Sequence, residues 1–535
     1  MQHKKEIKIN KENIIVILIF IIAIISRIYS WPNAIEGINC DEAMTAINAK
    51  AIAETGKDMY GTSLPVYFEA WLIAGQSALL TYFMAICIKV FGFTIFAIRL
   101  PMLVISIASL FIFYKLMKLI FKDKKIAIII LSILAINPWH IMQSIWSLDC
   151  NLFPHFLLLS IFALTKGMKE ENLKLIYFSM VLFGITTYSY GIALYAVPIF
   201  LSIYMIIGLK NKQIKVKQVA ISAMIVIAVA LPLIIMSFIN LFDLQSLKIG
   251  PITIQNFTYS IRTNDMLIFS DNIFEQFCKN FMTLFTLIIV NNDGLEWNSI
   301  FNIGTIYMGS IVFAIIGIIY LIKDKSIDKN SKSIVLIWLA VSVILGILIN
   351  NVNINRLNII WYPFVILIGF GIYKVLEDFH YKKICVGIIV LIYVLGFTNF
   401  IVKLHSDYSE TIKNSWTWDK GFVNVLNYAK SLNKNIVFDS EILKNDKNII
   451  FSIYTVNYSF KEQGFLDYKI LLNCYLDIYN TNIIEILNKI KVEDFEGNIL
   501  ENNIYIINKN NLADELNLDE YEINKFNEYY LISKR

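Results

Sequence analysis

Charged residues are scarce in this sequence. Of its 535 residues only 17% are Asp, Glu, Lys or Arg, whereas 57% are hydrophobic. A soluble globular domain carries about 25% charged residues, and a disordered chain is much poorer in hydrophobic ones. The composition therefore excludes both classes of protein. It favours a polytopic membrane protein, in which long apolar segments cross the bilayer.

Cysteine motifs and a strong net charge are also lacking. The six cysteines are Cys40, Cys87, Cys150, Cys278, Cys385 and Cys474. No two of them form a Cys-x-x-Cys pair, which excludes the common zinc and dithiol motifs. The net charge of +5 is not that of a nucleic-acid-binding protein, so we expect no nucleic-acid partner. No small-residue cleavage site follows the first apolar run, so we expect that run to remain as a helix.

Apolar runs dominate the first three quarters of the chain, and a run needs about 20 residues to cross a bilayer. The candidates are roughly residues 13–30, 99–120, 126–141, 151–167, 174–189, 191–209, 218–238, 303–322, 333–350, 357–375 and 384–402. A twelfth run, 76–92, has polar residues at helical spacing, namely Gln76, Ser77 and Lys89. Whether it crosses the membrane decides on which side each connection lies.

The distribution of lysines decides how run 76–92 lies. The lysine-rich connections are 1–12, 115–125, 166–174, 210–217, 323–332 and 374–383. Lysines in short loops favour the cytoplasmic side, and all six connections fall on one side only if 76–92 does not span. We therefore predict that 76–92 lies at the membrane interface. About 11 transmembrane helices remain.

The same lysines predict the sides of the cell membrane on which the segments of this multi-pass protein lie. The amino terminus is cytoplasmic and the carboxy-terminal domain is extracytoplasmic. Residues 1–402 form the transmembrane domain, with a first outer loop at 31–98 that carries juxtamembrane helices and another outer loop at 239–302. Residues 403–535 shift to Asn, Lys, Asp, Glu and Tyr and predict a small α/β domain.

Short β-type segments define this carboxy-terminal domain. We expect strands at 435–440 and 503–508 and a hairpin within 521–533, because these segments are rich in Ile, Val, Tyr and Phe. A helix is expected near 421–432.

Two adjacent carboxylates, Asp41 and Glu42, follow the first span in GINCDEAMTA. One interpretation is structural: Asp41 caps a short helix that ends near Gly56, and Glu42 lies in its first turn, where the helix dipole favours negative charge. The other interpretation is catalytic. The two are compatible, because an active site needs a carboxylate held in a fixed orientation.

A second acid, Asp149 in WSLDCN (146–151), also begins an outer helix, and capping is again the structural alternative. Paired carboxylates suit general-base catalysis, leaving-group handling or the binding of a divalent metal. His140, in NPWH (137–140), lies near this face and is a candidate for a pocket. A histidine at a helix end is more often structural, however.

Arg356, in NINRLN (353–358), is the one cation in the short outer loops. Its guanidinium either anchors a helix end or binds a phosphate, for which its planar donor fork is well suited. The loop 291–307 is rich in turn-forming and hydrogen-bonding residues. In it Trp297 fits an interfacial aromatic belt, whereas Asn298 is a candidate for a sugar or phosphate pocket.

Taken in order, four of these stretches resemble those of a known family. They are Asp41-Glu42, IRLP (98–101), NPWHIMQSIWSLDCN (137–151) and Arg356. Over roughly residues 10–400 the chain is similar to GT-C glycosyltransferases of the protein O-mannosyltransferase and lipid A aminoarabinose transferase group (glycosyltransferase family 39-like). The many spans, the long first outer loop and the outward tail agree with this resemblance.

The resemblance implies an inverting glycosyltransferase with a polyprenyl-phosphate donor that carries one sugar. It implies a protein, lipid or glycan acceptor reached from the outer face, with membrane lipids as surroundings. Asp41 would be the base, Asp149 a supporting acid and Arg356 a contact to the lipid phosphate. Relatives differ on metals: a divalent ion bridging Asp41 and Asp149 would be an alternative way to hold the phosphate.

The sequence also departs from the pattern of this family. Eukaryotic mannosyltransferases have a His-Pro-Pro stretch in the first loop, whereas only Pro65 stands in SLPVYFEAW (63–71). Relatives often carry an Arg after the second-loop serine, whereas Ile145 follows Ser144 here. Loop 239–302 is too short to house the sugar-binding insert of the eukaryotic members. These departures put the acceptor and the second site in doubt.

Two other classes of protein compete with an enzyme. A lipid or oligosaccharide transporter or flippase usually places ionisable residues within its spans, often beside broken helices. Here the spans are nearly free of charge, which disfavours transport. A structural membrane protein whose tail binds a partner would leave the outer acids as helix caps alone.

Overall fold

The computed structural model describes residues 10–31, 39–58, 60–70, 74–257, 265–378 and 382–406. In the tail it describes 428–429, 431–432, 434–439, 490–493, 500, 502–508, 520–526 and 529–534. Contacts divide the chain into two units. The bundle unit contains residues 1–31, 102–234 and 263–404, and the loop-and-tail unit contains residues 32–101, 235–262 and 405–535.

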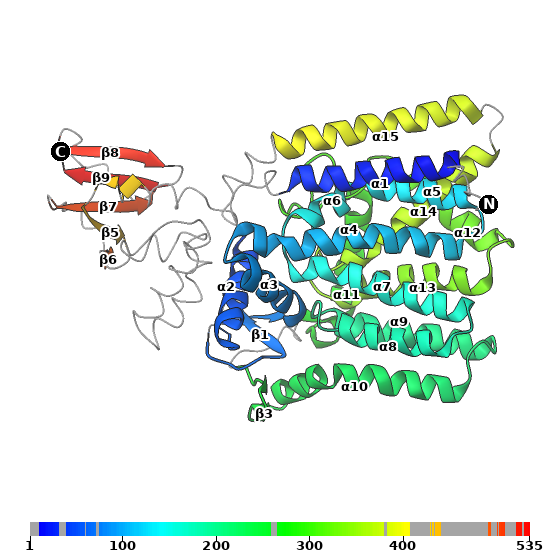
Figure 1. The fold of residues 1–535 in the computed structure, drawn as a ribbon, viewed down its shortest axis with the longest axis horizontal. Coiled ribbons are helices and arrows are strands. Elements are labelled where there is room, and N and C mark those ends of the chain that lie inside the picture. The colour runs from blue at the N-terminus through cyan, green and yellow to red at the C-terminus, as the bar shows by residue number, and fades with distance from the viewer. Residues whose placement is uncertain are drawn as a thin grey trace, which may run out of the picture. The chain divides into compact units, whose positions relative to one another are not determined.

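Helices that run side by side build the bundle unit (Figure 1). They are α1 (Lys11–Ser30), α4 (Ile95–Ile120), α5 (Lys124–Ala135), α6 (Pro138–Ile145), α7 (Asp149–Lys169), α8 (Leu173–Thr186), α9 (Ala193–Lys210), α10 (Val216–Leu241), α12 (Ser310–Lys323), α13 (Lys329–Leu348), α14 (Trp361–Asp378) and α15 (Lys382–His405). The first residues of α4 and the last residues of α10 belong to the other unit.

The predicted spans all correspond to helices. In the described part of the chain nine helices are long and apolar enough to cross a membrane, or ten if the bent pair α5–α6 is one span. Eight of the nine, the bent pair and the two shorter helices α8 and α12 match the eleven predicted runs. The prediction of a polytopic helical membrane protein is thereby confirmed. Run 76–92 forms α3 (Ala78–Phe91), which has 14 residues like α8 and α12. Its length therefore does not separate it from the spans, and its place at the interface stays a prediction.

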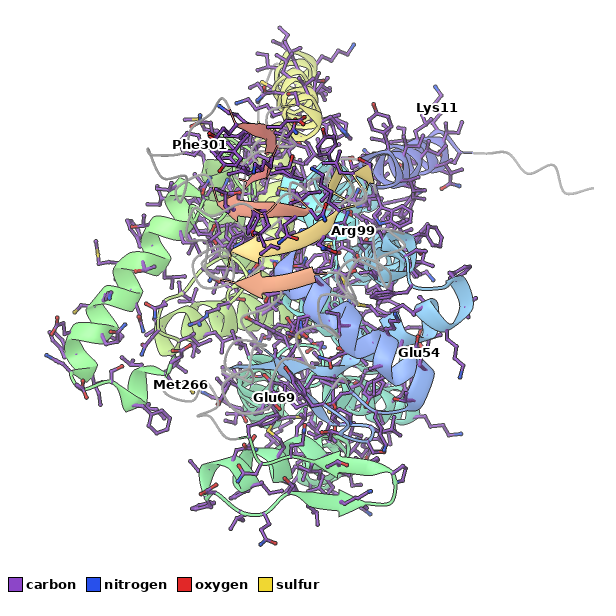
Figure 2. The ribbon with its side chains drawn as sticks, turned by 90° about the vertical axis from the view of Figure 1, so that its left-hand side faces the viewer. Lys11, Glu54, Glu69, Arg99, Met266 and Phe301 are labelled. Atoms are coloured by element: carbon purple, nitrogen blue, oxygen red, sulfur yellow. The ribbon has the colours of Figure 1, made fainter. Side chains whose placement is uncertain are left out.

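One of the nine span-length helices matches no predicted run. This helix, α11 (Ile273–Val290), lies within the predicted outer loop 239–302. By length and composition it could span, but it crosses the bundle at a steep angle, between the labels of Met266 and Phe301 in Figure 2. Its apolar side chains are exposed, among them Phe274, Phe281 and Met282. An amphipathic helix with this orientation is typical of the membrane surface. The sequence analysis did not identify it.

The stretch NPWH breaks one span into two helices. A residue that precedes a proline avoids helical backbone angles, so α5 cannot continue through Asn137 into Pro138. Pro138 instead takes the first position of α6, and the side chain of Asn137 accepts a hydrogen bond from the backbone N–H of His140 at 3.1 Å. The helices α5 and α6 meet at an angle of 53°.

A buried arginine compensates for this break. Arg27 in α1 is 0% exposed. Its Nη1 donates to the carbonyl oxygens of Ala23 at 2.7 Å and Ala135 at 2.9 Å, and its Nη2 donates to that of Leu134 at 3.2 Å. The carbonyl groups at the end of α5 lack helical partners, and leaving them unpaired among apolar side chains is costly. Arg27 therefore ties α1 to the broken span.

Two glycines let α12 and α14 pack closely. A Cβ atom at Gly317 would lie 2.0 Å from the carbonyl oxygen of Leu367, and one at Gly371 would lie 2.0 Å from that of Phe313. Only glycine allows backbones to approach this closely, as is common between transmembrane helices.

The loop-and-tail unit begins with the first outer loop. This loop folds into α2 (Cys40–Thr55), the antiparallel strands β1 (Tyr67–Ala70) and β2 (Ala74–Ser77), and α3. Strands β3 (Leu247–Ile249) and β4 (Ile252–Ile254) form a second hairpin. Thr253 joins the two segments, because its N–H donates to the carbonyl oxygen of Ser63 at 3.1 Å.

The tail forms a five-stranded mixed sheet in the order β6-β5-β7-β9-β8. Its strands are β5 (Asn435–Asp439), β6 (Ile490–Glu493), β7 (Asn503–Asn508), β8 (Tyr521–Phe526) and β9 (Tyr529–Lys534). Val437, Tyr505, Ile507, Tyr530 and Ile532 form one buried cluster. The predicted strands and hairpin are confirmed. The predicted helix near 421–432 falls largely outside the described residues, and the domain boundary at 402 stays a prediction.

Replacing Arg27 tests its role at the broken span. We expect Arg27→Met to lower the free energy of unfolding by about 2–5 kcal/mol, because buried carbonyl groups lose their donors. Thermal unfolding of the full-length protein in detergent measures this loss. Lys115→Met, at an exposed cation of α4, is the matched control and should change little. Equal stability of the two variants would contradict the assigned role.

Candidate functional site

The first candidate residues lie at the start of α2. Its N-cap is Asn39, whose side chain accepts a hydrogen bond from the backbone N–H of Asp41 at 2.9 Å. Glu42 completes a capping box by accepting from the N–H of Asn39 at 3.5 Å. The interpretation of Asp41 as the cap is therefore wrong. The expected end of the helix at Gly56 is confirmed, because Gly56 is its C-cap with a φ of 71°.

A buried ion pair holds Glu42. The Nε of Arg99 lies 3.0 Å from its Oε1, and the Nη2 lies 2.9 Å from its Oε2. Both side chains are at most 1% exposed. This two-bond geometry is among the strongest for a carboxylate, and it commits both oxygens of Glu42. Arg99 belongs to the IRLP stretch, but a partner 57 residues away leaves no local signal in the sequence.

Asp41 has the opposite environment, because its side chain is exposed. Its backbone carbonyl accepts from the hydroxyl of Thr45 at 2.8 Å and from the Nε2 of Gln76, in β2, at 3.4 Å. Gln76 also donates to the hydroxyl of Thr45. The backbone of Asp41 is thus fixed by a cap, a buried ion pair at the next residue and a neighbouring strand, whereas the residue itself is exposed.

Asp149 is the first residue of α7 and is partly buried. Its Oδ1 accepts from the backbone N–H of Cys150 at 2.7 Å, and no side chain caps from the preceding residue, Leu148. The interpretation of Asp149 as the cap is therefore wrong, and it lies in the first turn instead. Asp41 and Asp149 belong to different units, so a metal bridging them stays a prediction.

Asn358 connects the helix of Asp149 to the segment of Arg356. Its Nδ2 donates to the carbonyl oxygen of Cys150 and to the Oε1 of Gln143, both at 2.9 Å. Its Oδ1 accepts from the indole of Trp139 at 2.5 Å. Asn358 is 1% exposed. Asn358 is the last residue of NINRLN, but no local feature of the sequence predicts that it connects three segments.

His140 lies inside the bundle at 0% exposure. Its Nδ1 accepts from the Nε of Arg27 at 3.1 Å, so its proton must be on Nε2, which lies 2.9 Å from the hydroxyl of Ser109. The hydroxyl of Tyr362 lies 3.0 Å from that of Ser109 and 2.8 Å from the Nδ1 of His155. Both ring nitrogens of His140 are engaged, which favours a structural role over a pocket.

Arg356 also has partners. Its Nη2 lies 2.8 Å from the Oδ2 of Asp265, and its Nη1 donates to the carbonyl oxygen of Asn350. Its side chain is 16% exposed and that of Asp265 is 36% exposed. A guanidinium with a half-exposed partner can exchange that partner for a phosphate, so either predicted role is open to it.

The loop 291–307 is tied to the same segment. The Oδ2 of Asp293 accepts from the Nδ2 of Asn298 at 2.7 Å and from the backbone N–H of Ile354 at 2.8 Å. Burial raises the pKa of Asp293. Asn298 is fully buried, and within the described structure its Oδ1 has no hydrogen-bond partner. Trp297 is partly buried. Asn298 and Arg356 are therefore brought close in the fold.

Two further carboxylates of the first outer loop, Asp58 and Glu69, were not predicted as site residues from the sequence. Asp58 is 4% exposed, and its Oδ1 accepts from the backbone N–H groups of Tyr60 at 3.0 Å and Thr62 at 2.7 Å. Glu69 lies in β1 and is partly buried. Burial, together with the charge of Asp58, raises the pKa of Glu69 to about 7. Its neighbours in sequence gave no hint of this environment.

The described residues include no cluster of three or more His, Cys, Asp or Glu side chains that would hold a metal ion. The donor set in this part of the chain therefore does not fit a metal centre held by side chains alone.

The raised pKa of Glu69 predicts a pH dependence of stability. The neutral carboxyl is tolerated in the fold, so its contribution is complete below the ordinary value of 4.5 and is lost as the pH rises through about 7. We expect Glu69→Gln to flatten the dependence of the melting temperature on pH between about pH 5 and pH 8. Glu54→Gln, at an exposed acid of α2, should leave the dependence as it is. A wild-type profile for Glu69→Gln would contradict the burial of that carboxyl.

Comparisons with known proteins bear on the family. Residues 76–236 match the family model described as dolichyl-phosphate-mannose-protein mannosyltransferase. No curated protein sequence matches the chain. Among solved structures, the fold is similar to ArnT from Cupriavidus metallidurans in the apo state, with a TM-score of 0.54, 11% identity and coverage of 97% of both chains.

Two further structures are also similar. ArnT from the same organism bound to undecaprenyl phosphate matches with a TM-score of 0.53, 9% identity and 97% coverage of both chains. The oligosaccharyltransferase of Archaeoglobus fulgidus in complex with Zn and sulfate matches with a TM-score of 0.52 and 13% identity, over 78% of this chain and 55% of its own. This chain thus spans about half the length of the archaeal protein. The resemblance drawn from the sequence is confirmed: the chain is a polytopic helical membrane protein with the GT-C fold.

Proposed function

We propose that this protein is an inverting membrane glycosyltransferase, which moves one sugar from a polyprenyl-phosphate donor to a protein, lipid or glycan acceptor at the outer face of the cell membrane. The match of residues 76–236 to a mannosyltransferase family supports the reaction class. A similar fold in a protein bound to undecaprenyl phosphate supports the class of donor. The observation that carries the proposal is the exposed carboxylate of Asp41 on a rigid helix start.

Asp41 acts as the general base in this reaction. The acceptor hydroxyl oxygen forms a bond to the anomeric carbon, and its proton passes to the carboxylate of Asp41. The bond from the anomeric carbon to the phosphate oxygen breaks, and its electron pair leaves with the lipid phosphate. Because a phosphate leaves without protonation, one base suffices, unlike the two carboxylates of glycoside hydrolysis. Glu42 stays paired with Arg99 and holds the helix start.

The other candidates take supporting roles. Arg356 stabilises the charge of the leaving phosphate by exchanging Asp265 for it. Asp149 supports the second outer loop, at the helix that Asn358 connects to the Arg356 segment. Asn298, with a buried Oδ1 that has no partner among the described residues, stays a candidate for the sugar pocket together with its neighbour Trp297. His140 supports the fold through Arg27.

The lysine-rich connections support the proposed orientation. With all of them in the cytoplasm, the first outer loop and the Arg356 segment face outward, together with the carboxy-terminal domain. An outward site reaches acceptors outside the cell, whereas a polyprenyl donor diffuses to it within the bilayer.

Transport is the second candidate function, and one observation favours it. Transporters place charges and broken helices within the membrane, and Arg27 lies beside the break between α5 and α6. The guanidinium N–H groups of Arg27, however, donate to carbonyl oxygens and to His140. Arg27 therefore has a structural role. A sugar-transfer assay distinguishes a transferase from a transporter, because only a transferase releases free lipid phosphate.

Asp41→Asn tests the proposed base. We expect it to lower sugar transfer by about 10²- to 10⁴-fold with an unchanged melting temperature, because only proton removal is lost. The assay follows release of undecaprenyl phosphate from a panel of undecaprenyl-phosphate sugars by the purified protein. Full activity of Asp41→Asn would refute the role.

Glu42→Gln is the comparison variant for Asp41→Asn. It leaves the buried charge of Arg99 without its partner, so we expect a loss of on the order of 3–5 kcal/mol in the free energy of unfolding. The two neighbouring acids should thus separate cleanly into one that matters for rate and one that matters for stability.

Arg356 and Asp265 form a matched pair of variants. If Arg356 binds the donor phosphate, Arg356→Gln weakens donor binding, whereas Asp265→Asn strengthens or preserves it by freeing the guanidinium. If the pair is only structural, both variants lower stability and donor affinity alike. Binding of undecaprenyl phosphate to the purified variants, measured together with their melting temperatures, separates these outcomes.

A further inference from the structure

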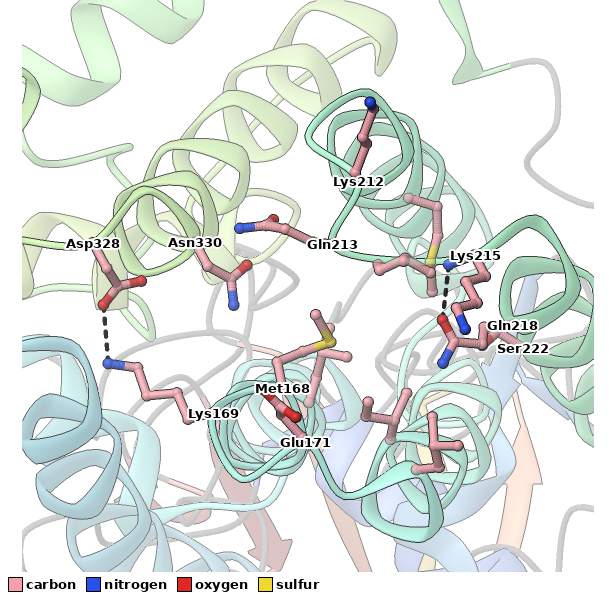
Figure 3. A pocket seen from close by; sticks show the side chains of 15 residues that line it. Met168, Lys169, Glu171, Lys212, Gln213, Lys215, Gln218, Ser222, Asp328 and Asn330 are labelled. Atoms are coloured by element: carbon pink, nitrogen blue, oxygen red, sulfur yellow. Dashed lines mark hydrogen bonds and ion pairs between the residues drawn. The ribbon is translucent and has the colours of Figure 1, made fainter.

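A cavity of about 730 Å³ opens at the lysine-rich end of the bundle unit (Figure 3). It lies among the last turns of α7 and α9, the first turns of α8 and α10, and the start of α13. Asp149 begins α7 and Lys169 ends it, so a 21-residue helix of about 30 Å separates the cavity from Asp149. The cavity is therefore distinct from the Arg356 segment, which Asn358 ties to the start of α7.

Three lysines and two acids line this cavity. Lys169 is neutralised by Asp328, with 3.0 Å between its Nζ and the Oδ2. Lys212 and Lys215 form no ion pair with any residue that the structure describes. The connection that carries them, KNKQIKVK, contains four lysines and no acid. The net field over this rim is positive, although Glu171 also lies there.

The backbone at Lys212 gives a second indication. Its φ is +56°, a left-handed conformation that glycine or asparagine adopts with less strain at the end of a helix. The N–H of Gln213 caps α9 by donating to the carbonyl oxygen of Gly208 at 2.8 Å, so the turn is well formed. The turn thus holds Lys212 and the following residues at the rim of the cavity.

The inner wall of the cavity is apolar. Leu164, Met168, Ile176, Met205 and Ile214 line it, and polar groups of Gln213, Gln218 and Asn330 lie among the lysines. Leu173, on the same wall, is 45% exposed at the start of α8. A positive rim above an apolar wall fits an amphiphile with an anionic head, and the volume falls in the range of small-molecule sites. Basic pockets between transmembrane helices bind such lipid head groups.

We propose that this cavity binds the phosphate head group of an anionic phospholipid, with Lys212 and Lys215 contacting the phosphate and the apolar wall covering the start of an acyl chain. The lipid would bridge the α7–α8 and α9–α10 connections. It would thereby hold the lysine-rich ends of these helices together. This inference is independent of the proposed transfer reaction.

The test uses the full-length protein in nanodiscs of phosphatidylcholine that contain a minority of phosphatidylglycerol. Native mass spectrometry counts the phosphatidylglycerol molecules retained after mild delipidation. We expect the double variant Lys212→Gln/Lys215→Gln to lower this retention roughly tenfold. The double variant Lys323→Gln/Lys325→Gln removes the same charge from another lysine-rich connection and should retain phosphatidylglycerol as the wild type does.

Inorganic phosphate distinguishes a lipid from a soluble phosphate ligand. Added in excess, it should not displace the retained phosphatidylglycerol, because it lacks the apolar part that the wall covers. Displacement by inorganic phosphate would overturn the proposal in favour of a soluble ligand. Unchanged retention in the Lys212→Gln/Lys215→Gln variant, or an equal loss in the control variant, would overturn it as well.

Discussion

A backbone carbonyl buried among apolar side chains must find a donor, and the bundle satisfies this requirement with one arginine. The break at Asn137-Pro138 leaves the end of α5 without helical partners, and Arg27 of α1 supplies them. The same guanidinium fixes the tautomer of His140, and through it the hydroxyl groups of Ser109 and Tyr362. The position of α6, and hence of the second outer loop that follows it, depends on this contact.

The proposed site uses adjacent acids for opposite purposes. Glu42 is buried and paired, so its negative charge neutralises that of Arg99 and stabilises the start of α2. Asp41, one residue earlier, is exposed, and this pair immobilises its backbone. Adjacent positions on a helix are about 100° apart, which is enough to place one carboxylate in the core and the other at the surface. A catalytic base must be held in a fixed orientation, and the ion pair of the neighbouring residue contributes to this.

Local and one-dimensional signals explain what could be predicted from the sequence. Apolar length identified the spans, and β-type residues identified the strands of the tail. What was missed depends on distant contacts: the partner of Arg99 is 57 residues away, and that of Arg27 is more than a hundred. The cap at Asn39 was missed because Asp41 has equal capping propensity. The helix α11 was missed because its polar residues interrupt the apolar run.

Two short unbroken helices of the bundle, α8 and α12, have a consequence for the surrounding lipid. At 14 residues, α8 and α12 are each about 21 Å long, whereas the hydrocarbon core of a bilayer is about 30 Å thick. Hydrophobic mismatch of this size draws the lipid inward beside a helix. Beside a helix this short, the bilayer thins or the flanking polar residues extend to reach its interface.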